Sequence, residues 1–321
     1  MNEPLVSVVT LSYRKYEYIY QCIDSVFKQN YSNIEYIISD DGADNFPRKE
    51  IEEYISKNRT ISIRKIKIIC GRENLGTVKN ANKAFDCATG EYIIPLSCDD
   101  VFFDENVVGN IVRSFQRTGA DVIGTTRLLS TEKLIPIRRM PMQYYHRRIY
   151  SMKSAKEQFL AMITDQYYEM VSGAVTNYRA NFWKKIKFDE AYTLWEDGPF
   201  FTKIMQSGVR VYFDFDIISI FYRAGGVSTN QSIHPKLLAD SEKYRERYCI
   251  EKLKDFSSYP FFYRRLKRCQ EFSPRFCGRW LTKFLKILFF PDVVVYKIKK
   301  LIDLKFALKL EEKFVSKIYY K

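Results

Sequence analysis

The stretch YIIPLSCDDV, residues 92–101, joins an apolar run to two adjacent acids, Asp99 and Asp100. Residues 92–96 have the continuous apolar character of a strand that is buried on both faces of a sheet. Such a strand ends at the edge of the core, and the two carboxyl groups follow at that edge. A solvated turn and a seat for a metal ion both fit the pair, so the surrounding sequence has to decide between them.

Apolar runs and segments of helical periodicity alternate along the N-terminal half of the chain. We expect strands at residues 5–11, 34–38, 61–69 and 92–96, and helices at residues 16–27, 47–57, 78–88 and 107–115. The strand–helix–strand order predicts right-handed crossovers and an α/β fold with a doubly wound, mostly parallel sheet. Ligands of such sheets bind beyond the carboxyl ends of the strands.

Polar clusters follow three of the predicted strands. SYRK follows the first strand, SDDG the second and SCDD the fourth. The fold alone predicts polar loops at these places, but it does not require carboxylates in two of them. The sequence contains neither the GxGxxG nor the Walker A pattern, which disfavours a dinucleotide oxidoreductase and a P-loop phosphatase.

The basic residues are concentrated near the C-terminus. The chain of 321 residues has a formal net charge of +14, and residues 259–321 carry 16 Lys and Arg against 5 Asp and Glu. A charge of this size favours an anionic partner. We therefore expect a domain of residues 1–232 followed by a helical, basic region of residues 233–321.

Cysteine usage and the apolar stretches indicate the compartment. The seven cysteines form no CxxC pair and the chain has two histidines, which disfavours a zinc site and favours free thiols in a reducing compartment. The first residues lack a secretory signal pattern, and no stretch of 18 uncharged apolar residues predicts a conventional membrane span. These observations favour a cytoplasmic protein.

Long stretches of the chain resemble the family 2 glycosyltransferases, which have the GT-A fold and invert the anomeric centre of the transferred sugar. The main matches are VSVVTLSYRKYEYIYQCIDSVFKQNYSNIEYIISDDG, ENLGTVKNANKAFDCATGEYIIPLSCDD and FDEAYTLWEDGPFFTKIMQSGVRVYF, at residues 6–42, 73–100 and 188–213. FYRAGGVS at residues 221–228 adds a shorter match. Residues 125–168 match poorly, as expected for the acceptor-specific part of a transferase.

The resemblance implies a metal site at the end of the fourth predicted strand. Asp99 and Asp100 match the loop that holds a divalent metal and the diphosphate of a nucleotide sugar. Carboxylate oxygens are suitable ligands for Mg²⁺ or Mn²⁺. Ser97 stands where many family members carry a further acid, so this chain departs from the three-acid version. The sequence does not assign which of the two aspartates contacts the metal and which the ribose.

The resemblance also implies a nucleotide-binding set. Asp41 matches an aspartate that accepts a hydrogen bond from uracil N3–H, which favours a UDP-sugar over a CDP-sugar. The alternative for SDDG is a turn that uses Asp and Gly for local backbone bonding. The other candidates for contact with the nucleotide are Leu11, Tyr13, Arg72, Asn74, Lys79 and Asp99. A helix-entry loop with surface cations explains the GRENLG segment equally well.

A second acid pair, Glu196 and Asp197, lies in LWEDGPFF. Pro199 is a favoured first residue of a helix, and acids at a helix start are stabilised by the macrodipole. The resemblance makes Asp197 the general base that takes a proton from the acceptor hydroxyl, and it makes Glu196 a residue that orients the acceptor or the donor sugar. Farther on, Arg223 either neutralises phosphate or pairs with a surface acid.

We therefore expect an inverting, metal-dependent glycosyltransferase. It would move a sugar from a nucleotide sugar, favoured to be a UDP-sugar, to a hydroxyl of a saccharide or lipid-linked acceptor in cell-surface polysaccharide biosynthesis. A basic nucleic-acid-binding protein would explain the charge but not the acids at the strand ends, so we expect no nucleic-acid partner. A non-catalytic GT-A binding domain would not need Asp99, Asp100 and Asp197 together. A nucleotidyltransferase would need a glycine-rich loop that LSYRKYEY lacks.

The C-terminal segment RWLTKFLKILFFPDVVVYKIKKLIDLKFALKL, residues 279–310, mixes bulky apolar residues with lysines. Phe284, Leu285, Leu288 and Phe289 share one face of a predicted helix, which Pro291 ends. A helix pair packed on the catalytic domain and an anchor lying on anionic lipid both fit this pattern. The second interpretation places the protein peripherally at the inner face of the cell membrane.

Overall fold

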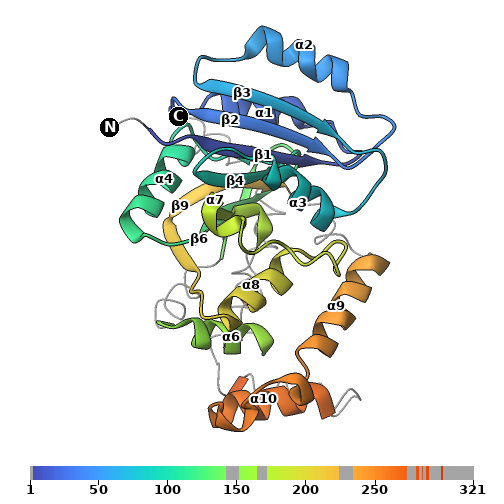
Figure 1. The fold of residues 1–321 in the computed structure, drawn as a ribbon, viewed down its shortest axis with the longest axis vertical. Coiled ribbons are helices and arrows are strands. Elements are labelled where there is room, and N and C mark those ends of the chain that lie inside the picture. The colour runs from blue at the N-terminus through green and yellow to red at the C-terminus, as the bar shows by residue number, and fades with distance from the viewer. Residues whose placement is uncertain are drawn as a thin grey trace.

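The computed structural model describes residues 3–141, 152–164, 172–223 and 234–272, together with residues 280, 281, 284, 287, 288 and 298. In these residues one mixed sheet of nine strands organises the fold (Figure 1). The strands are β1 (Val6–Ser12), β2 (Ile34–Asp40), β3 (Ile63–Cys70), β4 (Tyr92–Ser97), β5 (Val101–Phe102), β6 (Val122–Ser130), β7 (Pro136–Met140), β8 (Thr176–Arg179) and β9 (Tyr212–Arg223).

One half of the sheet is parallel, in the order β3–β2–β1–β4. Every residue of β2 is buried, because helices cover both faces of the sheet. Alternate residues of a strand face opposite sides, and accordingly Val9 and Ile37 belong to one hydrophobic core while Val8 and Ile38 belong to the other. The predicted doubly wound, mostly parallel sheet is confirmed.

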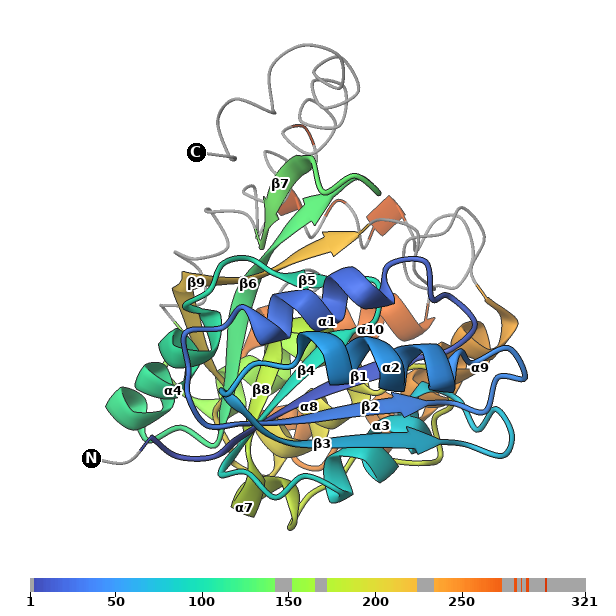
Figure 2. The ribbon, with the colours of Figure 1, turned by 90° about the horizontal axis from the view of Figure 1, so that it is seen from above.

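Two layers of helices cover these cores. The layer over the core of Val8 and Ile38 is α1 (Ile19–Phe27), α2 (Arg48–Asn58) and α4 (Val107–Thr118). Figure 2 shows α1 and α2 on one side of the sheet, with α3 and α8 on the far side. The far layer includes α3 (Thr77–Asp86), α6 (Ala155–Ile163), α7 (Ala180–Trp183) and α8 (Asp197–Gln206).

The other half of the sheet brings the end of β9 beside the acid loop. β8 joins β4 to β6 by antiparallel pairing, and β6 runs parallel to β9. β5 then pairs antiparallel with the end of β9, with Val101 opposite Phe221. The chain directly after Asp100 is therefore fixed to the last residues of β9.

Predicted and observed element boundaries differ by a few residues. Helix α1 begins at Ile19 rather than at residue 16, and α8 begins at Asp197 rather than at Pro199. Pro199 is tolerated as the third residue of α8, because the first four N–H groups of a helix have no partner within the helix. Asp197 therefore lies inside the first turn of the helix.

Helices α9 (Pro235–Arg247) and α10 (Phe261–Phe272) follow β9 in the sequence. Tyr244 of α9 is buried in the same core as Phe200 and Phe201 of α8. The division after residue 232 stays a prediction, although α9 shares its core with the preceding domain. The sequence YYHRR at residues 144–148, within the poorly matching stretch, and most of the C-terminal segment lie outside the described residues. Within the described part, no helix is both long and apolar enough to span a membrane.

Candidate functional site

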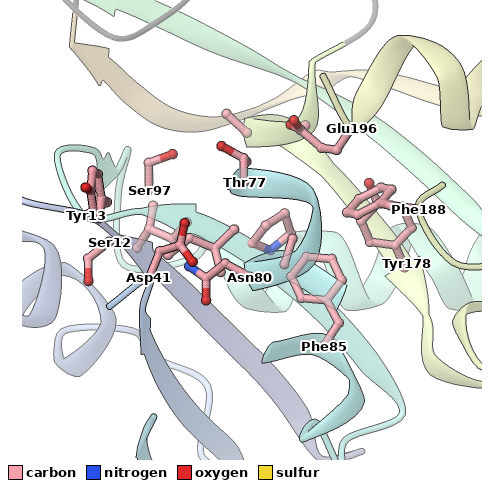
Figure 3. A pocket seen from close by; sticks show the side chains of 16 residues that line it. Ser12, Tyr13, Asp41, Thr77, Asn80, Phe85, Ser97, Tyr178, Phe188 and Glu196 are labelled. Atoms are coloured by element: carbon pink, nitrogen blue, oxygen red, sulfur yellow. The ribbon is translucent and has the colours of Figure 1, made fainter. Parts of the chain in front are cut away.

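The topology selects one place in the sheet for a ligand. Strand order reverses between β1 and β4, and ligands of open α/β sheets bind at the carboxyl ends of strands at such a switch point. A cavity of about 210 Å³ lies there, and Figure 3 shows the side chains that line it. The residues of its polar wall are Leu11, Ser12, Tyr13, Asp41, Thr77, Asn80 and Ser97. Leu11, Tyr13 and Asp41 thus lie where a nucleotide site was predicted.

Asp41 is buried in this wall and is bound to the start of α3. Its Oδ1 accepts the N–H of Leu75 at 3.0 Å, and its Oδ2 accepts the N–H of Gly76 at 2.8 Å. Burial raises the pKa of Asp41, while these two N–H groups lower it. Each carboxylate oxygen can accept two hydrogen bonds, so Asp41 can still accept a hydrogen bond from a ligand in the cavity.

The neighbouring Asp40 has a structural role, as the sequence suggested for the SDDG turn. Its Oδ1 accepts the N–H of Ala43 at 2.9 Å. Its Oδ2 accepts the hydroxyls of Tyr16 at 2.6 Å and Ser12 at 3.1 Å. Asp40 therefore shapes the turn and joins the ends of β1 and β2, and Asp41 lines the cavity.

The Asp99 and Asp100 loop is closed by β9. Asp100 is 1% exposed, and its Oδ1 accepts the backbone N–H of Arg223 at 2.9 Å. The other oxygen, Oδ2, is buried and has no hydrogen-bond partner within the part of the chain that the structure describes. Asp99 is only partly buried, so its carboxyl is the more accessible of the two.

Arg223 clamps this loop from the end of β9. Its guanidinium donates to the carbonyl oxygens of Asp99 and Glu132 and to Gln21 Oε1. It also lies over the ring of Tyr18, 4.1 Å from the ring centroid. Arg223 is 3% exposed, so the pairing with a surface acid that the sequence allowed is wrong.

The acid loop favours a cation for electrostatic reasons. Burial raises the pKa of Asp99, and burial together with the adjacent Asp99 raises the pKa of Asp100 well above its usual range. A bound divalent cation would relieve this repulsion. No group of three His, Cys, Asp or Glu side chains in the described residues could hold a metal by itself. The pair therefore fits a cation that takes further oxygen ligands from a diphosphate.

Glu196 and Asp197 are anchored across the cavity by a short 3₁₀ turn, Gly173–Val175. Asp197 Oδ2 accepts the N–H of Gly173 at 3.0 Å, and Oδ1 accepts the N–H of Gly198 at 2.6 Å. A side chain at position 173 would collide with Glu196 Oε1, so glycine lets the turn approach this pair. Glu196 and Gly173 line the cavity.

The surroundings of Glu196 favour the protonated form of its carboxyl group. Burial raises its pKa to about 8, and the charges of Asp197 and Asp240 add to that effect. Figure 3 shows Glu196 on the same side of the cavity as Tyr178 and Phe188. Tyr178 is fully buried, and its hydroxyl has no hydrogen-bond partner among the described residues. This end of the cavity therefore combines apolar rings with two neutral hydrogen-bond donors.

Four predicted nucleotide contacts, Arg72, Asn74, Lys79 and Asp99, lie outside the cavity wall. Arg72 and Lys79 are exposed, and Asn74 Oδ1 accepts the N–H of Gly76 at 3.0 Å. Their contact with a nucleotide stays a prediction. Sequence reasoning missed Thr77, Asn80, Gly173 and Tyr178. Of these, Asn80 lies within the helix that the sequence predicts at residues 78–88. No sequence pattern around Tyr178 indicates that it lines a cavity.

The fold is of the GT-A type, as in two solved structures of low sequence identity. A fragment of S. aureus TarS in complex with UDP-GlcNAc has a TM-score of 0.54 at 17% identity, covering 72% of this chain and 61% of that one. The mannosyltransferase PcManGT from Pyrobaculum calidifontis, in complex with GDP-Man and Mn²⁺, has a TM-score of 0.54 at 12% identity and covers 97% of this chain and 89% of that one.

Residues 7–161, just under half of the chain, match the model of Glycosyl transferase family 2. An uncharacterized glycosyltransferase of Haemophilus influenzae is 33% identical over 31% of this chain and 29% of its own length. Glycosyltransferase GlyG of Streptococcus pneumoniae is 29% identical over 37% of this chain and 38% of its own. The aligned stretches thus span about a third of these two relatives.

A third relative is named for both its donor and its acceptor. The UDP-Glc:alpha-D-GlcNAc-diphosphoundecaprenol beta-1,3-glucosyltransferase WfgD of Escherichia coli is 24% identical over 42% of this chain and 51% of its own length. The chain is therefore related to enzymes of polysaccharide biosynthesis.

Proposed function

We propose that this chain is an inverting glycosyltransferase that uses a UDP-sugar. The observation that carries the proposal is one cavity with Asp41 in its wall at one end and Glu196 at the other. The acid loop of Asp99 and Asp100 follows directly after Ser97, which lines the same cavity. A nucleotide sugar would place its base toward Asp41 and its sugar toward Glu196.

Asp41 and Asp99 would bind the donor. Asp41 would accept uracil N3–H while it keeps its two bonds to the start of α3. The more accessible Asp99 would be the principal metal ligand, and Asp100 would hold the loop against β9. A Mg²⁺ or Mn²⁺ ion bound there would supply positive charge beside the departing diphosphate.

Asp197 would act as the general base. The N–H groups of Gly173 and Gly198 fix its two oxygens and leave further acceptor positions for the acceptor hydroxyl. The proton of that hydroxyl passes to Asp197 as its oxygen bonds to the anomeric carbon. The bond from that carbon to the diphosphate oxygen breaks on the opposite face, so the configuration inverts. Protonated Glu196 would donate a hydrogen bond to the sugar or the acceptor.

The acceptor would be a saccharide or a lipid-linked oligosaccharide, as the name of the E. coli relative gives for that protein. The exposed C-terminal residues support a peripheral place on anionic membrane at the cytoplasmic face. Large apolar side chains are exposed at spacings that share one helix face, at Trp280, Leu281, Phe284, Ile287 and Leu288. Apolar residues beside many lysines bind the headgroup region of acidic bilayers.

A screen of nucleotide sugars tests the activity. The full chain should bind UDP-sugars in the presence of Mn²⁺ and release UDP slowly by hydrolysis, and EDTA should stop both. GDP- and CDP-sugars serve as controls. Binding without any turnover, with a range of saccharide acceptors present, would favour a non-catalytic GT-A domain. Absence of binding to every nucleotide sugar would contradict the proposal.

Sedimentation with vesicles tests the membrane surface. The full chain should sediment with vesicles rich in phosphatidylserine at low salt and be partly released by high salt. Deletion of residues 273–321 should abolish sedimentation and leave UDP binding intact. A full chain that stays in the supernatant would show that the C-terminal segment is a packing element.

A further inference from the structure

The segment that leads into the second acid pair is held by helix α9. Asp240 of α9 is 2% exposed, and its carboxylate accepts three consecutive backbone N–H groups. The distances are 2.9 Å from Thr193, 2.7 Å from Leu194 and 3.1 Å from Trp195. Glu196 follows directly. A buried carboxylate that binds three adjacent amides fixes the backbone of residues 193–195 in one conformation.

Other side chains of α9 hold the same segment. The ring of Trp195 packs on Tyr244 with centroids 4.9 Å apart, and the Tyr244 hydroxyl lies 2.8 Å from Thr202 Oγ1 on α8. Arg247 pairs with Asp189, four residues before the segment. Helix α9 therefore contacts this segment at both ends and contacts the helix that carries Asp197.

The opposite side of the segment contacts the start of α3, next to the polar wall of the cavity. The carbonyl oxygen of Thr193 accepts the N–H of Val78 at 3.2 Å in the first turn of α3. A Cβ at Gly76 would lie 2.6 Å from the same oxygen, and the N–H of Gly76 donates to Asp41. Residues 193–195 thus lie between Asp41 on one side and Asp240 on the other.

We propose that Asp240 is a positioning residue, whose carboxylate fixes residues 193–195 and thereby sets the placement of Glu196 and Asp197 against the cavity. Its catalytic consequence rests on the proposed function. The geometric part does not, because hydrogen bonds to the amides can be measured without turnover.

The charge of Asp240 also acts on Glu196. The titratable groups that face Glu196 are Asp197 on its own helix, Asp240 on α9 and Tyr178 on β8. Asp240 raises the pKa of Glu196, so an uncharged residue at position 240 should lower that pKa. A residue that only stabilised the fold would leave the titration of Glu196 unchanged.

The first experiment compares Asp240→Asn with Glu242→Gln, an exposed acid on the same helix, in the full chain. Hydrogen exchange should become at least tenfold faster at the amides of Thr193, Leu194 and Trp195 in Asp240→Asn and stay unchanged in Glu242→Gln. Carboxyl NMR should give a lower pKa for Glu196 in Asp240→Asn. Unchanged exchange at these amides would overturn the proposal.

The second experiment measures release of UDP from whichever UDP-sugar the wild type turns over. Asp240→Asn should lower kcat about 10- to 100-fold, because small misplacement of a catalytic group has effects of that size. The dissociation constant of UDP should change less than twofold. A normal kcat with faster exchange would overturn the catalytic part.

Two controls keep the outcomes separate. If Asp240→Asn fails to bind UDP because it is unfolded, Asp240→Glu replaces it; that variant keeps the charge, displaces the carboxyl group, and should lower kcat without lowering the pKa of Glu196. If the wild type turns over no nucleotide sugar, the proposed function fails, and hydrogen exchange still decides the role of Asp240.

Discussion

The two acid pairs of the cavity region are held in opposite ways. Asp99 and Asp100 are clamped by the buried cation Arg223, whereas Glu196 and Asp197 are held by backbone amides and by a segment bound to the buried anion Asp240. Among the described residues one oxygen of Asp100 has no hydrogen-bond partner, and in the second pair burial raises the pKa of Glu196. We infer that the first pair is suited to a metal ion and the second to proton transfer.

The largest expected effect is on turnover, and it tests the proton-transfer role of the second acid pair. Asp197→Asn should lower turnover by on the order of 10²–10⁴, because the variant cannot take the proton of the acceptor. UDP binding should survive, since Asp197 makes its described bonds to Gly173 and Gly198 and does not line the cavity. Steady-state kinetics and calorimetry check both parts. Near-normal turnover would rule out this role, and Glu242→Gln is the matched control.

The next effect is on metal-dependent binding of UDP, and it tests the role of the first acid pair. Asp99→Asn combined with Asp100→Asn should abolish the dependence of UDP binding on Mn²⁺. The free energy of unfolding should stay equal or rise, because the pKa of both carboxyls is raised by burial and neutral side chains remove that cost. Calorimetry with UDP and Mn²⁺, followed by urea denaturation, makes the test. Undiminished metal-dependent binding would contradict the assignment.

Nucleotide choice gives a smaller effect. The wild type should bind UDP more tightly than CDP, and Asp41→Ala should weaken UDP binding by about 1–3 kcal/mol. Part of that loss comes from the start of α3, whose N–H groups Asp41 accepts. Asp41→Asn keeps one acceptor and should weaken UDP binding less. Equal affinities of the wild type for UDP and CDP would disprove the uracil contact.

The pH dependence of stability tests the second acid pair by itself. The pKa of Glu196 is raised from 4.5 to about 8, so the folded state binds a proton that the unfolded state releases between these values. Stability should therefore fall as pH rises from 5 to 8. Glu196→Gln should remove that fall in urea denaturation at the two pH values. An identical pH dependence in wild type and variant would show that Glu196 titrates normally.

The parallel half of the fold could be predicted because its signals are local. Buried strands and amphipathic helices are read within about ten residues, and topology then brings the strand ends together. The family resemblance singled out Leu11, Tyr13 and Asp41 as nucleotide contacts, and all three line the cavity. Sequence reasoning could not find Gly173, Tyr178 or Asp240, since each acts through contacts with segments distant in the sequence. The structural role of Arg223 was missed for the same reason: Asp100 lies 123 residues before it.

Arg223 and Asp240 lie close together in the sequence, which bears on how the protein is made. Chains fold from the N-terminus as they leave the ribosome. Strands β1 to β4 and the Asp41 wall are complete long before this late stretch emerges. The residues that hold the two acid pairs, Arg223 and Asp240, are therefore synthesised within the same short interval. A nascent chain can therefore complete the parallel half of its sheet before either acid pair is fixed in place.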